Sequence, residues 1–164
     1  MRTADDADFT AFVAGSSRRL LGLAHLLTGD RYAAEDLLQG ALERTYRSWP
    51  RINRDGAPES YVRRALVNAS TDRWRRRRGV AEVGLGEARL AEADPSDLTA
   101  SRDALMRAVR ELPAGQRAVL VLRYFEGLTE AQTAAVMECS VGTVKSQHAR
   151  ALARLRTLMP SGRV

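Results

Sequence analysis

A run of hydrogen-bonding and cationic side chains lies near the C-terminal end of the chain, between residues 143 and 154. Hydroxyl and amide groups can hydrogen-bond to the edges of bases, and cations can neutralise phosphates, so this mixture suits contact with nucleic acid. The alternative is an ordinary solvated helix face, because any helical hairpin has one. The residues concerned are Thr143, Lys145, Ser146, Gln147, Arg150 and Arg154.

Two helices joined by a short turn are predicted to position these side chains. Thr129 and Gln132 have the spacing of a capping box, which begins one helix. Ser140 can cap a second, longer helix, and Glu138 occupies the turn position that often carries glycine, at a cost of about 1 kcal/mol. The second helix has an apolar stripe at three- and four-residue steps, so the arrangement indicates a helix-turn-helix motif. The stripe consists of Val144, His148, Ala151, Leu155 and Leu158.

Cationic charge is concentrated in two segments that flank an acidic one. Residues 61–78 hold seven arginines and one acid, whereas residues 79–101 hold five acids and one arginine. Residues 141–159 hold four cations and no acid, and the whole chain has a formal net charge of +6. This distribution favours a polyanionic partner that meets two separate cationic surfaces.

Helical patterns account for the rest of the chain, and no strand-like alternation or internal repeat is present. Gly29 and Asp30 separate the first two expected helices, as a C-terminal cap and the next N-cap. Residues 50–58 are rich in Pro, Asn, Asp and Gly and are expected to form a loop. Before the capping box, the expected helices cover residues 8–27, 31–49, 58–78, 102–111 and 116–125.

These patterns predict an all-α fold of two small helical domains joined by a linker. The first domain is expected at residues 1–79, where Trp74 is assigned to helix packing, and the second at residues 102–160. Residues 80–101 are acidic, rich in Gly and Ala and weakly periodic, which is typical of a flexible linker. Residues 161–164 are expected to be disordered.

No combination of residues suggests catalysis or a metal site. The motifs of zinc proteases, P-loop enzymes, serine hydrolases and dinucleotide-binding enzymes are absent. His25 and His148 lie far apart, each at an apolar helix position. Glu35, Asp36 and Glu43 share one expected helix, without a second acidic helix to complete a metal site. We therefore expect a protein that is not an enzyme and that uses no cofactor.

The single cysteine and the hydropathy of the chain bear on its compartment. Cys139 has no partner for an intrachain disulfide, so a reducing compartment and an inert thiol are expected. Residues 1–9 are acidic and lack the apolar core of a signal peptide. Because no apolar run approaches the ~18 residues of a membrane span, we expect a cytoplasmic protein without membrane insertion.

Three segments resemble the extracytoplasmic-function (ECF) sigma factors of bacterial RNA polymerase. Residues 112–156, LPAGQRAVLVLRYFEGLTEAQTAAVMECSVGTVKSQHARALARLR, resemble region 4 of that family. Residues 26–42, LLTGDRYAAEDLLQGAL, and residues 59–78, ESYVRRALVNASTDRWRRRR, resemble parts of region 2. The segments occur in the family's order, with no region 3 domain, and are most similar to the actinobacterial SigE group. The resemblance implies a dissociable specificity subunit of RNA polymerase.

The resemblance also implies roles for individual residues. Asp36 and Gln39 would dock on the clamp helices of the largest polymerase subunit, and the flap of the second-largest subunit would be a further contact of the chain. Residues 51–57 would hold a base flipped from the non-template strand, which offsets part of the cost of melting. The minus-ten element would be contacted by Asn68 and Asp72, with Arg73, Arg75 and Arg76 on nearby phosphates. The minus-thirty-five element would be read by Lys145, Ser146 and Arg150, supported by Thr143, Gln147 and Arg154.

Four positions depart from the family's pattern. Gly40 stands where an acid is usual, which would weaken the clamp contact or the helix, and Glu138 replaces the usual turn glycine. Gln147 and Ala149 replace a commonly basic and a commonly bulky residue on the recognition helix. The DNA sequence preferred by that helix would therefore differ from the preferences of other members.

Partners and an alternative function follow from the same comparison. In this family an anti-sigma factor commonly covers the polymerase- and DNA-binding faces, so such a partner is expected here. The alternative is an autonomous helix-turn-helix regulator that binds operators without polymerase. The N-terminal half discriminates between them, because such a regulator needs neither Asp36 and Gln39 on an exposed helix nor a second basic helix.

Overall fold

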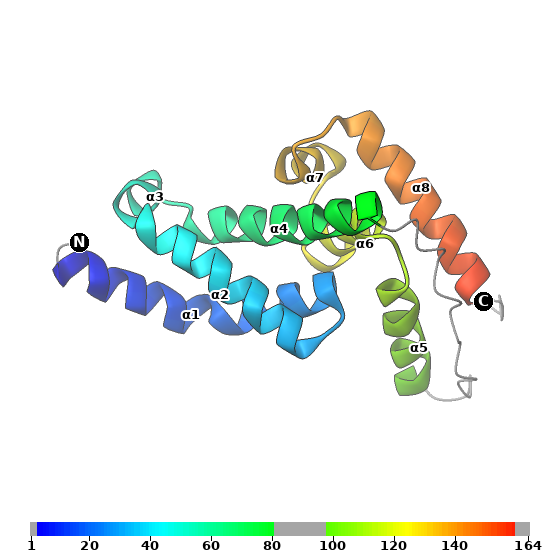
Figure 1. Cartoon of the computed structure of the whole chain (residues 1–164), viewed down its shortest axis with the longest axis horizontal. Coiled ribbons are helices and arrows are strands. Elements are labelled where there is room, and N and C mark those ends of the chain that lie inside the picture. Colours follow the sequence, from blue (N-terminus) through cyan, green and yellow to red (C-terminus); the bar gives the residue numbers. More distant parts are fainter. Residues whose placement is uncertain (1–2, 81–97, 160–164) are drawn as a thin grey trace. The chain divides into compact units, whose positions relative to one another are not determined.

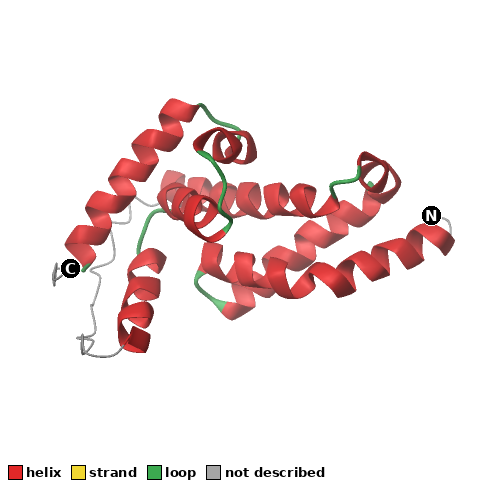
Figure 2. Ribbon diagram, turned by 180° about the vertical axis from the view of Figure 1, so that it is seen from behind, coloured by secondary structure: helices red, strands yellow, loops and turns green. Residues whose placement is uncertain are grey.

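The computed structural model describes residues 3–80 and 98–159, with side chains for residues 3–72 and 101–159. Every regular element in these ranges is a helix, which confirms the predicted all-α class (Figures 1 and 2). The chain divides into two compact units, Met1–Ser70 and Thr71–Val164. Most of the predicted linker, and the predicted disordered tail at residues 161–164, lie outside the described residues.

The first unit contains α1 (Thr3–Thr28), α2 (Arg31–Arg47), α3 (Trp49–Asp55) and the first part of α4 (Pro58–Val80). α1 and α2 lie side by side (Figure 1). An ion pair of 2.7 Å between Arg19 of α1 and Glu59 of α4 ties those two helices together at the surface. The buried apolar side chains of the unit include Leu20, Leu23, Leu27, Leu37, Leu38, Val62, Leu66 and Val67.

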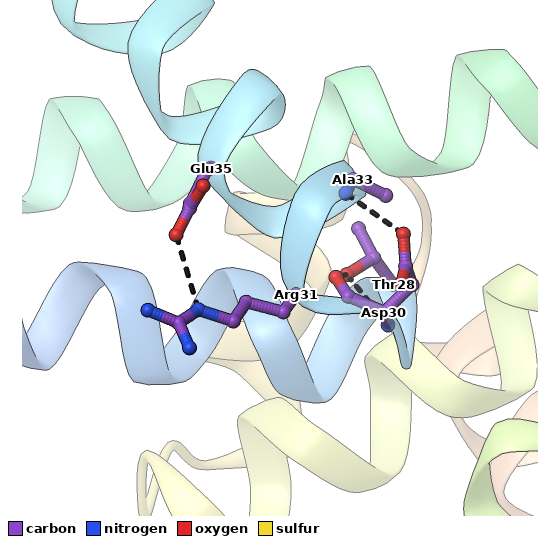
Figure 3. A network of polar contacts seen from close by, with 5 residues as sticks. All are labelled: Thr28, Asp30, Arg31, Ala33 and Glu35. Atoms are coloured by element: carbon purple, nitrogen blue, oxygen red, sulfur yellow. Dashed lines mark hydrogen bonds and ion pairs between the residues drawn. The ribbon is translucent and has the colours of Figure 1, made fainter.

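The boundary between α1 and α2 has the predicted chemistry (Figure 3). Gly29 has a φ of +75°, and the Asp30 carboxylate accepts a hydrogen bond from the Ala33 amide at 3.0 Å. This contact satisfies one of the free amide groups at the start of α2. Arg31, the residue after this cap, forms an ion pair of 3.3 Å with Glu35, which lies one helical turn further along α2. α1 begins at Thr3, earlier than the expected Asp8.

The predicted loop at residues 50–58 is wrong, because most of it is the short helix α3. Trp49 is 1% exposed and packs against Phe9 and Phe12 of α1, with ring centroids 5.1 and 5.2 Å apart. Pro50 stands in the first turn of the helix, a position that tolerates proline, and Gly56 closes it with a φ of +76°. The packing of the buried Trp49 on α1 therefore stabilises the helix α3. The turn-forming residues of this segment do not reveal that packing.

The second unit contains α5 (Leu98–Arg110), α6 (Ala114–Leu120), the π-helical turn η1 (Val121–Phe125), α7 (Glu130–Met137) and α8 (Val141–Leu158). The single helix expected at residues 116–125 is thus an α-helix followed by a π-helical turn. Two apolar clusters fix α8 against the other helices. One contains Ala108, Leu112, Leu120, Ala151 and Leu158, and the other contains Val119, Ala134 and Val144.

Arg117 of α6 fastens the end of α5 to the start of α6. Its Nε donates to the Val109 carbonyl at 3.2 Å, and its Nη2 donates to the carbonyls of Arg110 and Leu112 at 2.7 and 2.8 Å. These carbonyls lie at and just beyond the C-terminal end of α5, where the helix has no further amide groups to donate hydrogen bonds to them. Burial lowers the pKa of Arg117, and nearby Glu111 opposes that shift.

None of the helices in the described ranges is long and apolar enough to cross a membrane.

Candidate functional site

The helix-turn-helix predicted near the C-terminal end is present with its caps. The Thr129 hydroxyl accepts from the Gln132 amide at 3.0 Å, and Gln132 Oε1 accepts from the Thr129 amide at 2.9 Å, which completes the capping box. The Ser140 hydroxyl accepts from the Thr143 amide at 3.0 Å at the start of α8. Glu138 ends α7 with a φ of 55° and a ψ of 46°, the left-handed conformation expected of this turn position.

Three of the predicted base readers lie exposed on α8. Lys145, Ser146 and Arg150 have solvent-facing side chains, and no hydrogen bond or ion pair within the described residues engages them. Thr143 is also exposed, but its hydroxyl shares a 2.9 Å hydrogen bond with Ser140. The helix therefore presents one lysine, one arginine and a hydroxyl that are available to a ligand.

Two other residues of the predicted set turn partly inward. The amide group of Gln147 lies against Gly115 of α6, 3.7 Å from the point where a Cβ on that glycine would stand. Arg154 is half-buried, and its Nε is enclosed without a hydrogen-bond partner. Both side chains therefore help to seat α8 on its own unit, and sequence spacing alone did not reveal this.

Sequence reasoning missed a contact between η1 and α8. The Tyr124 hydroxyl and His148 Nε2 are 2.8 Å apart, and their rings stack with centroids 5.7 Å apart. Tyr124 is 61% exposed, so the pair lies at the surface beside the polar face of α8. His148 had been assigned only to the apolar stripe, and its partner depends on the π-helical turn, which has no clear sequence signal.

The residues predicted to meet the minus-ten element follow one another along α4. Asn68 is half-buried and Asp72 is exposed. Arg73, Arg75 and Arg76 belong to α4, but their side chains, like that of Trp74, lie outside the described side chains. In α3, the helix immediately before α4, residues 53–55 are exposed.

The two predicted docking residues lie on the outer surface of α2. Asp36 and Gln39 are exposed, and Gln39 Nε2 donates to Glu43 Oε1 at 3.5 Å. Beside them runs a groove of about 560 Å³ between α1 and α2. Its lining consists of Phe9, Leu21, Leu38, Leu42 and Tyr46, with Glu35, Gln39 and Glu43. The face therefore combines carboxylates with an apolar groove.

A polar contact beside this groove joins α2 to α1. The Tyr46 hydroxyl donates to Asp6 at 2.9 Å, and this hydrogen bond to a carboxylate raises the pKa of Tyr46. Among the described residues, no group of three or more His, Cys, Asp or Glu side chains could hold a metal ion.

Comparison with known proteins gives a consistent result along the whole chain. The model of Sigma-70 region 2 matches residues 12–80, and that of Sigma-70 region 4 matches residues 102–155. The RNA polymerase sigma-E factor of Streptomyces coelicolor is 40% identical over 91% of this chain and 84% of its own length. The ECF RNA polymerase sigma factor SigM of Mycobacterium tuberculosis is 35% identical over 87% of this chain and 72% of its own.

A solved structure has the same fold. The sigma factor RpoE of Bartonella quintana, determined in complex with the anti-sigma factor NepR, matches with a TM-score of 0.67. The match covers 95% of this chain and 99% of that chain at 24% identity, so it supports the fold alone. With region 2 and region 4 in order and long matches to curated relatives, the chain belongs to the ECF group of RNA polymerase sigma factors.

Proposed function

We propose that this alternative sigma factor, which directs transcription initiation, works through three separate surfaces. α2 docks on core RNA polymerase, α4 approaches the minus-ten element and α8 reads the minus-thirty-five element. The observation that carries the proposal is the outer face of α8. There Lys145, Ser146 and Arg150 are exposed and make no hydrogen bond or ion pair with the part of the chain that the structure describes, while the caps and apolar side chains hold the helix.

The proposed contact of α8 is with the major groove of the minus-thirty-five element. A lysine or arginine can donate to guanine O6 and N7, and a serine hydroxyl can bond to several base edges. Lys145, Ser146 and Arg150 are proposed to make these contacts, and Thr143, Gln147 and Arg154 to support them. The burial of part of Gln147 and Arg154 favours a positioning role for these two residues.

The proposed contact of α4 is with the minus-ten element. Asn68 and Asp72 offer hydrogen-bonding groups, and the arginines that follow them in sequence suit the phosphate backbone. We assign the phosphate contacts to Arg73, Arg75 and Arg76. Residues 51–57, which are mostly α3, are proposed to hold the flipped base from a helical rather than a loop conformation.

The proposed polymerase contact is the docking face of α2, defined by Asp36 and Gln39. Their exposure, and the carboxylates of Glu35 and Glu43 along the adjoining groove, suit a cationic helical partner. We propose that this partner is the pair of clamp helices of the largest subunit. We also propose that region 4 contacts the flap of the second-largest subunit. The relatives are sigma factors, which are not enzymes, and no catalytic role is proposed.

Two domains separated by a linker suit a promoter with two recognition elements. The proposed boundaries are residues 1–79 and 102–160, with residues 80–101 as a tether. Because the two elements lie too far apart for one small domain, a tether allows both to be bound, and effective concentration strengthens weak contacts. We further propose that the protein acts in the cytoplasm and that an anti-sigma factor covers these faces when the protein is inactive.

Transcription in vitro tests the proposal. Core RNA polymerase is incubated with a library of promoter fragments, with and without this chain. Initiation that depends on the chain and on two spaced motifs is expected. Specific binding of the free chain to DNA, without association with polymerase and without initiation, would instead support the autonomous regulator.

A charge reversal tests the docking face. Asp36→Arg should abolish binding of the full chain to core RNA polymerase, because a cationic partner would meet a cation. Asp8→Arg makes the same change of charge on an exposed position of α1 and should leave the affinity close to that of the wild type. Equal affinities for Asp36→Arg and the wild type would show that the docking assignment is wrong.

A further inference from the structure

Gly40 lies in the interior of α2 without a structural reason inside its own unit. Glycine weakens a helix relative to alanine and is favoured where the backbone needs a positive φ or where another group approaches closely. Gly40 is not among the described glycines with a positive φ. A Cβ added there would meet no atom within 4 Å, apart from its own turn of helix. Neither conformation nor packing accounts for Gly40, and the same is true of Gly15 and Gly22 in α1. What distinguishes Gly40 from these two glycines is its place on the docking face of α2.

The surroundings of Gly40 are those of the docking face. Asp36 precedes it by one helical turn and Glu43 follows it by three residues, and this spacing places all three on one side of α2. Gln39 adjoins Gly40 in the chain and lines the groove between α1 and α2. Along α2, the bare backbone of Gly40 therefore lies between the exposed carboxylates of Asp36 and Glu43, whereas the groove is lined by the neighbouring stripe of Leu38, Leu42 and Tyr46.

We propose that Gly40 is a close-approach point, at which a docked helix of core RNA polymerase packs directly on the backbone of α2. The distance between two packed helices is set by the side chains at their contact, so a missing side chain lets the axes come closer. At that distance, cations of the partner reach Asp36 and Glu43. This inference rests on the proposed docking of α2.

The close-approach point and the family pattern predict opposite effects of a carboxylate at position 40. If Gly40 merely lacks the acid that is usual in the family, Gly40→Glu adds a charge contact and tightens binding. If the partner packs on the bare backbone, any side chain at this position separates the helices, and Gly40→Glu weakens binding. The sign of the change decides between the two explanations.

The experiment compares four full-length chains, namely the wild type, Gly40→Ala, Gly40→Glu and the control Gly15→Ala. Gly15 is an exposed glycine inside α1 whose added Cβ would also meet nothing within 4 Å. Both alanine variants should raise the melting temperature by roughly 2–8 °C, because alanine is the better helix former. The Kd for core RNA polymerase should rise about tenfold or more for Gly40→Ala, and should stay unchanged for Gly15→Ala.

The outcomes separate this inference from the function on which it rests. An unchanged Kd for Gly40→Ala, or a lower Kd for Gly40→Glu, overturns the close-approach point. If Asp36→Arg abolishes binding in the same assay, the docking face stands even when the close-approach point is overturned. If Asp36→Arg binds as tightly as the wild type, the docking face is wrong and the inference about Gly40 is wrong with it.

Discussion

At the scale of single residues, α8 separates the side chains that hold the helix from those that face solvent. Val144 and Ala151 are fully buried, whereas Lys145 and Arg150 are exposed and have no hydrogen-bond or ion-pair partner among the described residues. A side chain that makes no contact within its own unit can be removed with little effect on folding, because surface substitutions away from such contacts change stability little. Its loss therefore reports on ligand binding.

Lys145→Ala should weaken binding of the holoenzyme to its promoter selectively. If Lys145 contacts a base, the loss is about 1–3 kcal/mol for promoters with the preferred base and much smaller for others. Arg156→Ala, which removes an exposed cation from the last turn of the same helix, should weaken all sequences alike. Titration of a panel of promoter fragments measures the affinity of both variants. An equal loss of affinity for all promoters in Lys145→Ala would show that Lys145 contacts a phosphate and not a base.

The turn of the helix-turn-helix contains one strained residue. Glu138 is the only non-glycine residue with a positive φ among the described residues, and its conformation costs about 1 kcal/mol relative to glycine. Glu138→Gly should therefore raise the free energy of unfolding by about that amount in urea titrations. Glu138→Ala keeps the Cβ and should give little gain, and equal gains for both variants would contradict this explanation.

At the scale of the elements, the junction between α5 and α6 depends on one half-buried cation, Arg117. Arg117→Met keeps an unbranched apolar side chain but leaves three carbonyls without their donor. The expected loss of stability is about 1–3 kcal/mol, because the carbonyls of Val109 and Leu112 are partly shielded from water and lose a charged donor. Arg110→Met, at an exposed position, should cost much less in the same urea titrations, and similar losses would argue against the proposed clamp.

Local chemistry explains which elements could be predicted from the sequence. The capping box at Thr129, the cap at Ser140 and the stop at Gly29 are contacts between residues a few positions apart, so their spacing is visible in the chain. The helix α3 was missed because its main support, the packing of Trp49 on α1, joins residues about forty positions apart.

The same reasoning applies to the candidate site. The exposed positions of α8 follow from helical periodicity, and their prediction needed only the apolar stripe. The inward turn of Gln147 depends on the bare Gly115 of another helix, and the contact of His148 depends on the π-helical turn that carries Tyr124. Such pairings are set by tertiary packing, so the spacing of residues along one helix could not reveal them.

At the scale of the whole molecule, the proposed tether should tolerate a change of length. Each doubling of a flexible loop costs only about 0.6 kcal/mol in closure entropy. Inserting about ten Gly and Ser residues after residue 90 should therefore reduce initiation in vitro by no more than a few-fold. The same residues added after Val164 serve as the control. A much larger loss from the internal insertion would show that the segment has a fixed length.

The capping of α7 and α8 has a consequence for the evolution of promoter choice. The caps at Thr129 and Ser140 and the buried Val144 and Ala151 hold the helices in place, and the exposed side chains of Lys145, Ser146 and Arg150 take no part in these contacts within the described residues. If Lys145 and its exposed neighbours read the promoter as proposed, substitutions there alter which sequences are bound while folding is preserved. A duplicated copy of this chain could therefore acquire a new set of target genes through a few changes, none of which requires a compensating mutation in the core.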